Sequence, residues 1–140
     1  MHAETIRNSF AKQGLMTSIG ARLEKVEAGA VSISCPRTAG VTQQHGFIHA
    51  GITTSIADSA CGYAAYTLMP EGTEVLSVEF KINLLRPANC EQIIAHARVI
   101  KPGKTLTVCD AEVVSDTGKL IARMQATMIC VANDAGKAAP

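Results

Sequence analysis

The segment from Gln43 to Tyr63 constrains the fold of this 140-residue chain more than any other part of the sequence. It reads QQHGFIHAGITTSIADSACGY, and small or apolar residues occupy almost every side of the helix that it predicts. A flat sheet covers only one stripe of a helix, so both faces of this one can be buried only if a strongly curved sheet wraps it. Met69-Pro70-Glu71-Gly72 ends the helix, because proline cannot continue it.

Four runs after this helix show the two-residue period of strands. Pro102-Gly103 and Asp116-Thr117-Gly118 mark turns between them, so we expect an antiparallel meander of all four strands. The alternating positions are Val78, Phe80, Ile82 and Leu84 in the first run; Ile93, Ala95, Ala97 and Val99 in the second; Thr107, Cys109, Ala111 and Val113 in the third; and Ala122, Met124, Ala126, Met128 and Cys130 in the last.

The part before the long helix predicts one short helix from Glu4 to Gln13, stopped by Gly14, and then a hairpin of two strands. The hairpin turns at residues 28–30, and its alternating positions are Ile19, Ala21 and Leu23 in one strand and Val31, Ile33 and Cys35 in the other. The whole order predicts an α+β hot-dog fold, a curved antiparallel sheet wrapped around one central helix. We expect one domain over residues 1–132 and a disordered tail over residues 133–140.

Charge and cysteine content exclude several classes of partner. Lys and Arg number 13 against 12 for Asp and Glu, so a net charge of +1 offers no field for nucleic acid or an anionic membrane. The five cysteines are widely spaced, and we expect buried free thiols in a reducing compartment. No apolar run approaches the roughly 20 residues of a membrane helix, and the start MHAETIRNSF has no signal pattern. These features predict a cytoplasmic protein.

Asp58 is the one carboxylate in the long helix. A helical projection places it opposite the stripe that should contact the sheet, which consists of Ile52, Ile56, Ala60, Tyr63 and Thr67. The residues around Asp58 on its own face are small, namely Gly51, Thr54, Ser55, Cys61, Gly62 and Ala65. The pattern alone leaves two interpretations open, an acid on a solvent-exposed face or a functional carboxylate in a close-fitting pocket.

The residues at the start of the helix favour the functional interpretation. His49-Ala50-Gly51 begins the helix, where free N–H groups and the helix dipole stabilise a developing oxyanion. Gln43 lies six residues earlier, and its amide is a candidate second donor to the same carbonyl oxygen. Donors, a small pocket and a carboxylate are the parts that attack on an acyl carbonyl requires.

Several motifs of this sequence occur in a known order. Gln43, Gly46, His49-Ala50-Gly51 and Asp58 are followed by the strand Ser77 to Ile82, which leads to Arg86-Pro87-Ala88, and by a turn from Lys101 to Leu106. From about Gln43 to Val131 the chain therefore resembles the hot-dog acyl-CoA thioesterases of the phenylacetate-pathway type, which are related to the thioesterase superfamily member 2 group.

The resemblance implies a role for each matching residue. Asp58 would act as general base or as nucleophile, a choice that the sequence leaves open, and Ser77 would orient water. Gln43 and the Ala50 N–H would hold the carbonyl oxygen, and coenzyme A would enter only as part of the substrate, with no cofactor and no metal. The implied substrate-binding residues are His49, Gly51, Val78, Arg86, Lys101, Gly103, Lys104 and Thr105. Without the resemblance, Lys101 and Lys104 are an ordinary solvated turn, His49 a structural helix start, and Ser77 a plain strand residue.

The chain departs from the family pattern at two positions. Ala50 stands at the first glycine of His-Gly-Gly, which keeps the N–H but adds a methyl group where the thioester comes close, so the range of acyl groups should be restricted. Gln43 stands where many members carry Asn, and its longer side chain needs a different backbone position to reach the carbonyl.

The sequence also gives expectations about assembly, metal binding and alternative functions. We expect a homodimer, or a dimer of dimers, in which Asp58 of one chain faces Ser77 and the coenzyme-binding turn of the other. A metal site of His45, His49, Cys35 and Cys61 is disfavoured by the ligand spacing, and no base is placed to activate Cys61 as a nucleophile. The alternative functions are a non-catalytic acyl-CoA sensor and, less favoured, a hot-dog hydratase or dehydratase. The sequence does not identify the acyl group or the pathway.

Overall fold

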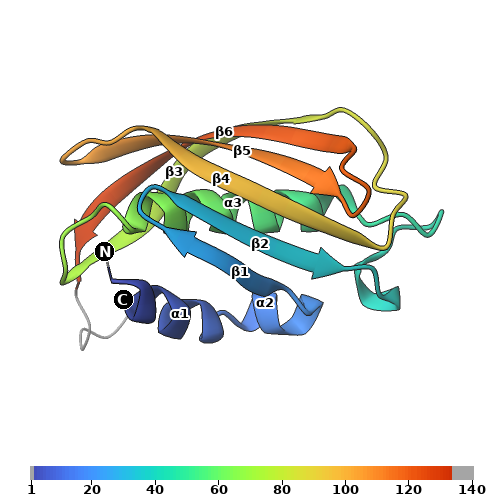
Figure 1. Cartoon of the computed structure of the whole chain (residues 1–140), viewed down its shortest axis with the longest axis horizontal. Helices are drawn as coiled ribbons and strands as arrows, with labels where there is room; N and C mark the ends of the chain where they lie inside the picture. The colour runs from blue at the N-terminus through green and yellow to red at the C-terminus, as the bar shows by residue number, and fades with distance from the viewer. Residues whose placement is uncertain (1, 134–140) are drawn as a thin grey trace.

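The computed structural model describes residues 2–133 (Figure 1). Two short helices come first, a long helix lies in the middle, and strands fill most of the rest. The elements in chain order are α1 (Ala3–Ala11), α2 (Gly14–Ile19), β1 (Arg22–Glu27), β2 (Ala30–Pro36), a 3₁₀ turn (Ala39–Val41), α3 (Ala50–Tyr66), β3 (Thr73–Leu84), β4 (Gln92–Lys101), β5 (Leu106–Ser115) and β6 (Leu120–Ala132).

The strands form one six-stranded antiparallel sheet in the order β1-β2-β4-β5-β6-β3. The turns predicted after β4 and β5 are confirmed, but the four-strand meander is wrong for β3, which pairs with β6 from Thr73↔Ala132 to Leu84↔Ala122. Residues 85–91 connect β3 to β4 and are long enough to cross the sheet, whereas a tight turn would have kept the two strands adjacent. As a result, β3 forms one edge of the sheet.

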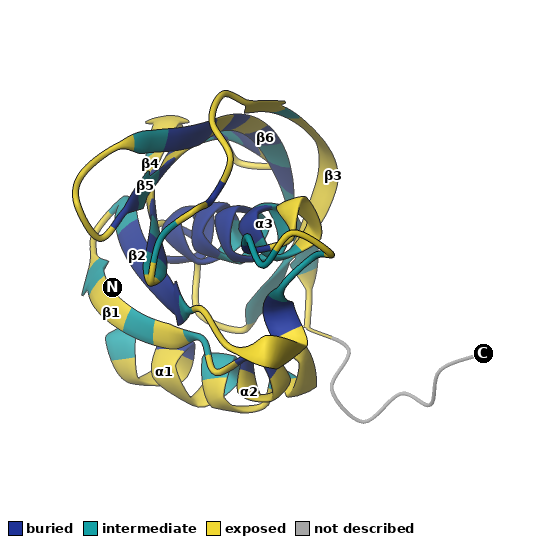
Figure 2. Ribbon diagram, turned by 90° about the vertical axis from the view of Figure 1, so that its right-hand side faces the viewer, coloured by how far each residue is buried: buried dark blue, intermediate teal, exposed yellow. Residues whose placement is uncertain are grey.

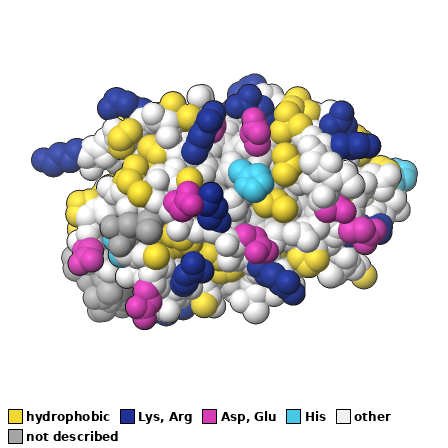
Figure 3. All heavy atoms as spheres, viewed as in Figure 1, with side chains coloured by type: hydrophobic (Ala, Val, Ile, Leu, Met, Phe, Trp, Pro, Cys, Tyr) yellow, Lys and Arg dark blue, Asp and Glu magenta, His cyan; other side chains and the backbone are white. Residues whose placement is uncertain are grey.

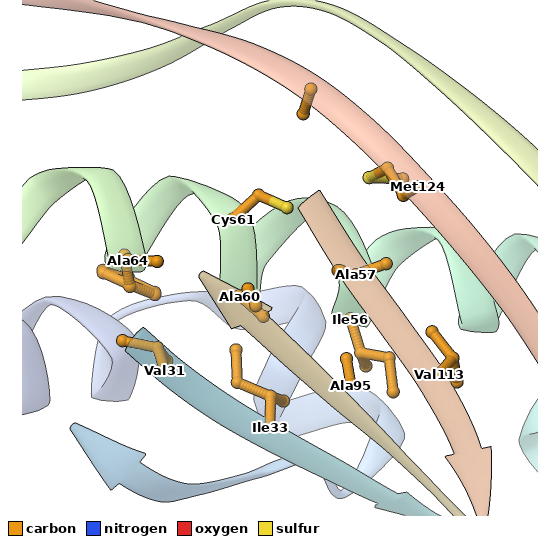
Figure 4. Close-up of a cluster of buried hydrophobic side chains, with 14 of the residues drawn as sticks. Val31, Ile33, Ile56, Ala57, Ala60, Cys61, Ala64, Ala95, Val113 and Met124 are labelled. Carbon is orange, nitrogen blue, oxygen red and sulfur yellow. The ribbon is translucent and has the colours of Figure 1, made fainter. Parts of the chain in front are cut away.

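The sheet wraps α3, and this confirms the hot-dog fold (Figure 2). Side chains of α3 interleave with residues from β2, β4, β5 and β6 (Figure 4), and Ile56, Ala57, Ala60, Cys61 and Ala64 have no exposed surface. Cys61 and Ala65, predicted on the same small-residue face as Asp58, are fully buried, and the burial of Cys61 agrees with its prediction as a buried thiol. The curved sheet covers more than one stripe of the helix.

The N-terminal part differs from the single helix that the sequence predicts. α1 ends at Ala11, and a second helix begins at Gly14, the residue expected to stop the first. Met16 and Ile19 of α2 are buried at helical spacing, so Ile19 belongs to this helix and the first strand begins only at Arg22. Gly20, at φ +74°, ends α2 in the left-handed conformation that favours glycine.

The outer face of the sheet is charged, whereas its β3 edge is apolar. Its broad outer face carries charges of both signs side by side (Figure 3), including ion pairs of Asp110 with Arg98 and Arg123. The β3 edge instead exposes four large apolar side chains, Leu76, Val78, Phe80 and Leu84, at 44–58% of their surface. An exposed apolar edge strand is a surface on which another strand can pair.

The C-terminal end and the cysteines differ in part from what the sequence predicts. The Asn133 N–H donates to Gly72 O at 3.2 Å, so this first residue of the predicted tail bonds to the domain, and the remainder of the tail lies outside the described residues. All five thiols are free, but only Cys35, Cys61 and Cys109 are buried, while Cys90 and Cys130 are partly exposed.

Candidate active site

The start of α3 is held by its own N-cap. The His49 Nδ1 accepts from the Gly51 N–H at 2.7 Å, and the His49 carbonyl accepts from the Ile52 N–H. A Cβ on Gly51 would lie 3.0 Å from His49 Nδ1, so glycine lets the imidazole close over the first turn. This bond gives His49 a structural role at the helix start, while its role as a substrate contact stays a prediction. The Ala50 N–H is left with no acceptor among the described residues.

Gln43 lies in the loop that packs beside this helix start. Its Oε1 accepts from the backbone N–H groups of His45 at 2.6 Å and Phe47 at 3.2 Å, which fixes the side chain in the loop. Within residues 2–133 its Nε2 has no acceptor, so this amide group is available as a donor. Gln43 and Ala50 line one cavity of about 430 Å³, which we call the donor cavity.

Asp58 lies farther along α3, in contact with the edge strand. The Ser77 Oγ donates to Asp58 Oδ1 at 2.6 Å and also lies 3.4 Å from Met128 Sδ. Both residues line a second cavity of about 260 Å³, which we call the acid cavity. The expectation that Asp58 faces Ser77 of another chain is therefore wrong, since the pairing of β3 with β6 brings Ser77 to Asp58 of the same chain.

The acid cavity has a polar wall that the sequence does not predict. The Tyr63 hydroxyl accepts from Gln13 Nε2 at 2.9 Å and lies 3.1 Å from Ser9 Oγ, so α1 and its following loop meet α3 at this wall. Gln13, Ser9 and Tyr63 all line the acid cavity. No sequence pattern marks them, because they come together only when the N-terminal helices pack beneath α3.

The two cavities are separated along one helix. Ala50 and Asp58 are eight residues apart, which corresponds to about 12 Å of helix. No residue lines both cavities. The structure thus brings Gln43 to Ala50 and Ser77 to Asp58, but it does not bring these two pairs together within one chain.

The other predicted substrate-binding residues are dispersed. Arg86 lines the donor cavity and donates to Leu120 O at 3.0 Å. Val78 is the extra residue of a β-bulge in β3 and is 53% exposed. Neither residue lines the acid cavity.

The turn from Lys101 to Thr105 lies at the end of the sheet where β3 begins. The Thr105 carbonyl accepts from the Cys130 N–H, and Cys130 pairs with Val75, a residue of the acid cavity. Lys104 and Thr105 are exposed, and Lys101 Nζ donates to Pro102 O at 3.0 Å. Gly103 is required by space, since a Cβ there would lie 2.1 Å from Leu106 O.

The thiols and the metal-ligating residues supply no competing centre. Burial raises the pKa of Cys61 far above its ordinary value and raises the pKa of Cys109 to about 12, so neither is a thiolate at neutral pH. Within residues 2–133 no group of three or more His, Cys, Asp or Glu side chains is arranged to hold a metal ion. Helices long and apolar enough to cross a bilayer are likewise absent from this part of the chain.

Comparison with known proteins gives one family. Residues 45–122 match the family model described as Thioesterase superfamily. A crystal structure of a thioesterase family protein from Silicibacter pomeroyi is 45% identical, with a TM-score of 0.91 over 94% of this chain and 99% of the other. A 1,4-dihydroxy-2-naphthoyl-CoA hydrolase of Listeria monocytogenes is 26% identical over 82% of this chain and 94% of its own length. Mouse acyl-coenzyme A thioesterase 13 is 34% identical over 59% of this chain and 63% of its own length.

Proposed function

We propose that this chain, which belongs to the thioesterase superfamily, hydrolyses acyl-CoA thioesters at a site shared by two copies of the chain. The observation that carries the proposal is the division of the chemistry along α3. Unbonded donors lie at Gln43 and Ala50, and a serine-bound carboxylate lies at Asp58, about 12 Å away. The coenzyme A thioesters named for the Listeria and mouse relatives support coenzyme A as the leaving group.

Two features of the surface support pairing of two copies. The outward side of α3 carries four residues at helical spacing, Gly51, Thr54, Ser55 and Asp58. Gly51 is exposed, and the other three are partly exposed. Two such helices, antiparallel and crossing between Thr54 and Ser55, place Asp58 of one copy opposite Gly51 of the other. The apolar β3 edge runs beside this face and offers a second copy a strand to pair with.

In this arrangement each site takes its donors from one chain and its acid from the other. The Ala50 N–H and the Gln43 amide bind the carbonyl oxygen and stabilise the negative charge that develops when the carbonyl carbon is attacked. On the general-base route, Asp58 removes a proton from the attacking water, the C–S bond breaks, and the thiolate of coenzyme A leaves and takes up that proton. On the nucleophile route, Asp58 attacks the carbonyl carbon, and the C–S bond breaks to release the thiolate of coenzyme A and leave a mixed anhydride. Water then hydrolyses the anhydride, which frees the acid and Asp58 and supplies the proton that the thiolate takes up.

Ser77 acts through Asp58 in this mechanism. Its hydroxyl donates to one carboxylate oxygen at 2.6 Å, which holds the carboxylate plane and leaves the other oxygen for water or the carbonyl carbon. Lys101 and Lys104 supply positive charge on the exposed turn near the acid cavity, where the phosphates of coenzyme A would be neutralised. Both lysines remain predicted contacts.

The test is release of coenzyme A from a panel of acyl-CoA thioesters, followed with a thiol reagent. The panel holds short and medium aliphatic chains and benzoyl-type groups, and the control variant is Asp116→Asn, which changes an exposed acid in a turn. We expect turnover of at least one member by the parent chain and by the control. Tight binding of acyl-CoA without thiol release by the parent chain would show the alternative function, a sensor.

A further inference from the structure

Gly62 lies in the interior of α3, where neither the backbone conformation nor packing requires a glycine. The described glycines with positive φ are at other positions. A Cβ built on Gly62 would have no neighbour within 4 Å beyond its own stretch of helix in the described part of the chain. Glycine in a helix interior is less stable than alanine, because it loses more backbone entropy on folding. The packing of the single chain therefore gives no reason for this residue.

Other positions of α3 show that small size alone does not call for glycine. Ala60 and Ala64 lie in the core with no exposed surface (Figure 4), so the helix uses alanine where the core leaves little room. Gly51 has a packing reason, since a Cβ there would lie 3.0 Å from His49 Nδ1. Gly62 differs from these residues, because it is partly exposed and the space beside it is open.

The open space beside Gly62 belongs to the acid cavity, which Asp58 also lines. The two residues are four positions apart, which corresponds to little more than one turn and about 6 Å along α3. The cavity volume of about 260 Å³ equals that of roughly nine water molecules at ~30 Å³ each. A group of a few carbon atoms that is bound at Asp58 and extends along the helix therefore passes over Gly62.

Side chains of the same chain stand on both sides of this space. At about 100° per residue, Gly62 lies between Asp58 and Tyr63 around the circumference of α3. Ser77 of β3 donates to Asp58 at 2.6 Å on one side, and Gln13 donates to the Tyr63 hydroxyl at 2.9 Å on the other. The recess between them admits a narrow group such as an acyl chain, whereas a second helix, about 10 Å across, needs a broad open face.

We propose that the acid cavity binds the acyl group and that Gly62 determines how large this group can be. The inference rests on the proposed function, which brings the thioester carbonyl to Asp58. From there the acyl group extends over Gly62 and fills the place that a side chain would take. The sulfur, which is the other substituent of the carbonyl carbon, points out of the cavity toward the exposed turn at Lys104. Gly62 is in this sense a specificity-determining residue.

The experiment adds one methyl group to the cavity with Gly62→Ala and compares kcat/KM for acetyl-CoA and for a larger thioester. The larger substrate is the one among hexanoyl-, octanoyl- and benzoyl-CoA that the parent chain hydrolyses best. We expect the ratio of larger substrate to acetyl-CoA to fall about tenfold, because an extra methyl group in a filled site causes strain. Acetyl-CoA is too short to reach Gly62 and should change by less than about threefold.

A larger side chain and a matched control sharpen the comparison. Gly62→Leu should lower the ratio further than Gly62→Ala does. Gly40→Ala also adds a methyl group in open space, but at a residue that lines neither cavity, so it should leave the ratio unchanged. Gly62→Ala should at the same time raise the midpoint of urea denaturation, because alanine favours the helix. A loss of activity with a gain in stability separates a ligand role of Gly62 from a structural one.

The outcomes separate this inference from the proposed function. An unchanged ratio in Gly62→Ala, or a parent chain that hydrolyses only acetyl-CoA of these substrates, would overturn the role of Gly62. An equal loss with both substrates would also overturn it, and a changed assembly state in light scattering would then show that a second copy occupies the space. Absence of thiol release by the parent chain from every acyl-CoA would overturn the proposed function itself. If circular dichroism shows Gly62→Leu to be unfolded, Gly62→Ala alone decides the ratio.

Discussion

The donor cavity and the acid cavity lie along the same helix but are built in opposite ways. The donor cavity is mostly apolar, and its donors are the Ala50 N–H and the Gln43 amide. The acid cavity is largely polar and contains Asp58, Ser77 and the hydroxyl of Tyr63. The donor cavity has a free backbone N–H and no carboxylate in its lining, whereas the acid cavity is lined by the carboxylates of Asp58 and Glu74.

With the function proposed above, each chain carries two halves of the reaction and not one complete site. A helix has a polarity, and only its first turn offers free N–H groups. The carboxylate that completes the chemistry must approach that turn from outside, because a side chain two turns along the same helix is about 12 Å away. We propose that a second, antiparallel copy of α3 supplies this carboxylate through symmetry.

Asp58→Asn should produce the largest effect, because it removes both the base and the nucleophile of the acid cavity. The amide has almost the shape of the carboxylate and can still accept from Ser77, so the fold should be preserved. We expect turnover to fall by at least ~10²-fold, the scale of general-base loss. The control is Asp116→Asn, and near-normal turnover of Asp58→Asn would show that the acid cavity is not catalytic.

Mixing two inactive variants tests whether the halves come from different chains. Ala50→Pro removes the donor N–H at a first-turn position that tolerates proline, so alone it should lower turnover by ~10²-fold. Co-expressed with Asp58→Asn at equal levels, it should form mixed dimers in which one of two sites has an intact acid and intact donors. Random pairing then restores about a quarter of the parent activity.

The mixing experiment is read against each variant alone at the same total concentration. Activity that stays at the level of the single variants, in a mixture shown by mass spectrometry to contain mixed dimers, would place donors and acid on the same chain. Parent-chain dimers measured by light scattering at micromolar concentration provide the reference for assembly.

The sequence predicts the donor cavity and the acid cavity to different extents. The start of α3, the Gln43 loop and the hot-dog fold were predicted, because each depends on local features such as helix periodicity and the capping residue His49. The chain that supplies Ser77 to Asp58 was predicted wrongly, because this contact depends on β3 pairing with β6 across the sheet. Strand order follows from long-range pairing. The alternating pattern of each strand is equally compatible with more than one neighbouring strand, so the pattern alone does not determine the order.

The polar wall of the acid cavity was missed for a related reason. Ser9 and Gln13 belong to the N-terminal segment, more than 40 residues from Asp58 in sequence, and reach the cavity through Tyr63. Tyr63 itself was assigned to the stripe facing the sheet, and it is 5% exposed, but its hydroxyl end bonds to α1 and its following loop. Burial of the ring was predictable, whereas the partner of the hydroxyl was not.

Ser77→Ala should produce a smaller effect than loss of the acid, because it removes only the bond that orients the Asp58 carboxylate. We expect kcat to fall by about tenfold with little change in KM, since substrate binding does not use this hydroxyl. The matched control is Ser34→Ala, which removes a strand serine bonded to Glu24 at the same distance of 2.6 Å, away from both cavities. Equal effects of the two substitutions on kcat would mean that Ser77 is only structural.

The smallest expected effect is that of Ala50→Gly, and it tests what the donor cavity requires of this position. Glycine and alanine present the same N–H to a carbonyl oxygen, so the oxyanion donor is retained and turnover of small acyl-CoA substrates should change by less than about threefold. The added backbone freedom should lower the free energy of unfolding by at most ~1 kcal/mol, measured by urea denaturation. Because the alanine methyl lines the donor cavity, its removal should raise kcat/KM for bulkier acyl groups relative to small ones. A large loss of turnover with small substrates, in a variant shown to be folded, would mean that the methyl group itself positions the thioester. Ala50→Pro would then owe its effect to shape and not to the missing N–H, and the donor half of the site would have to be assigned elsewhere.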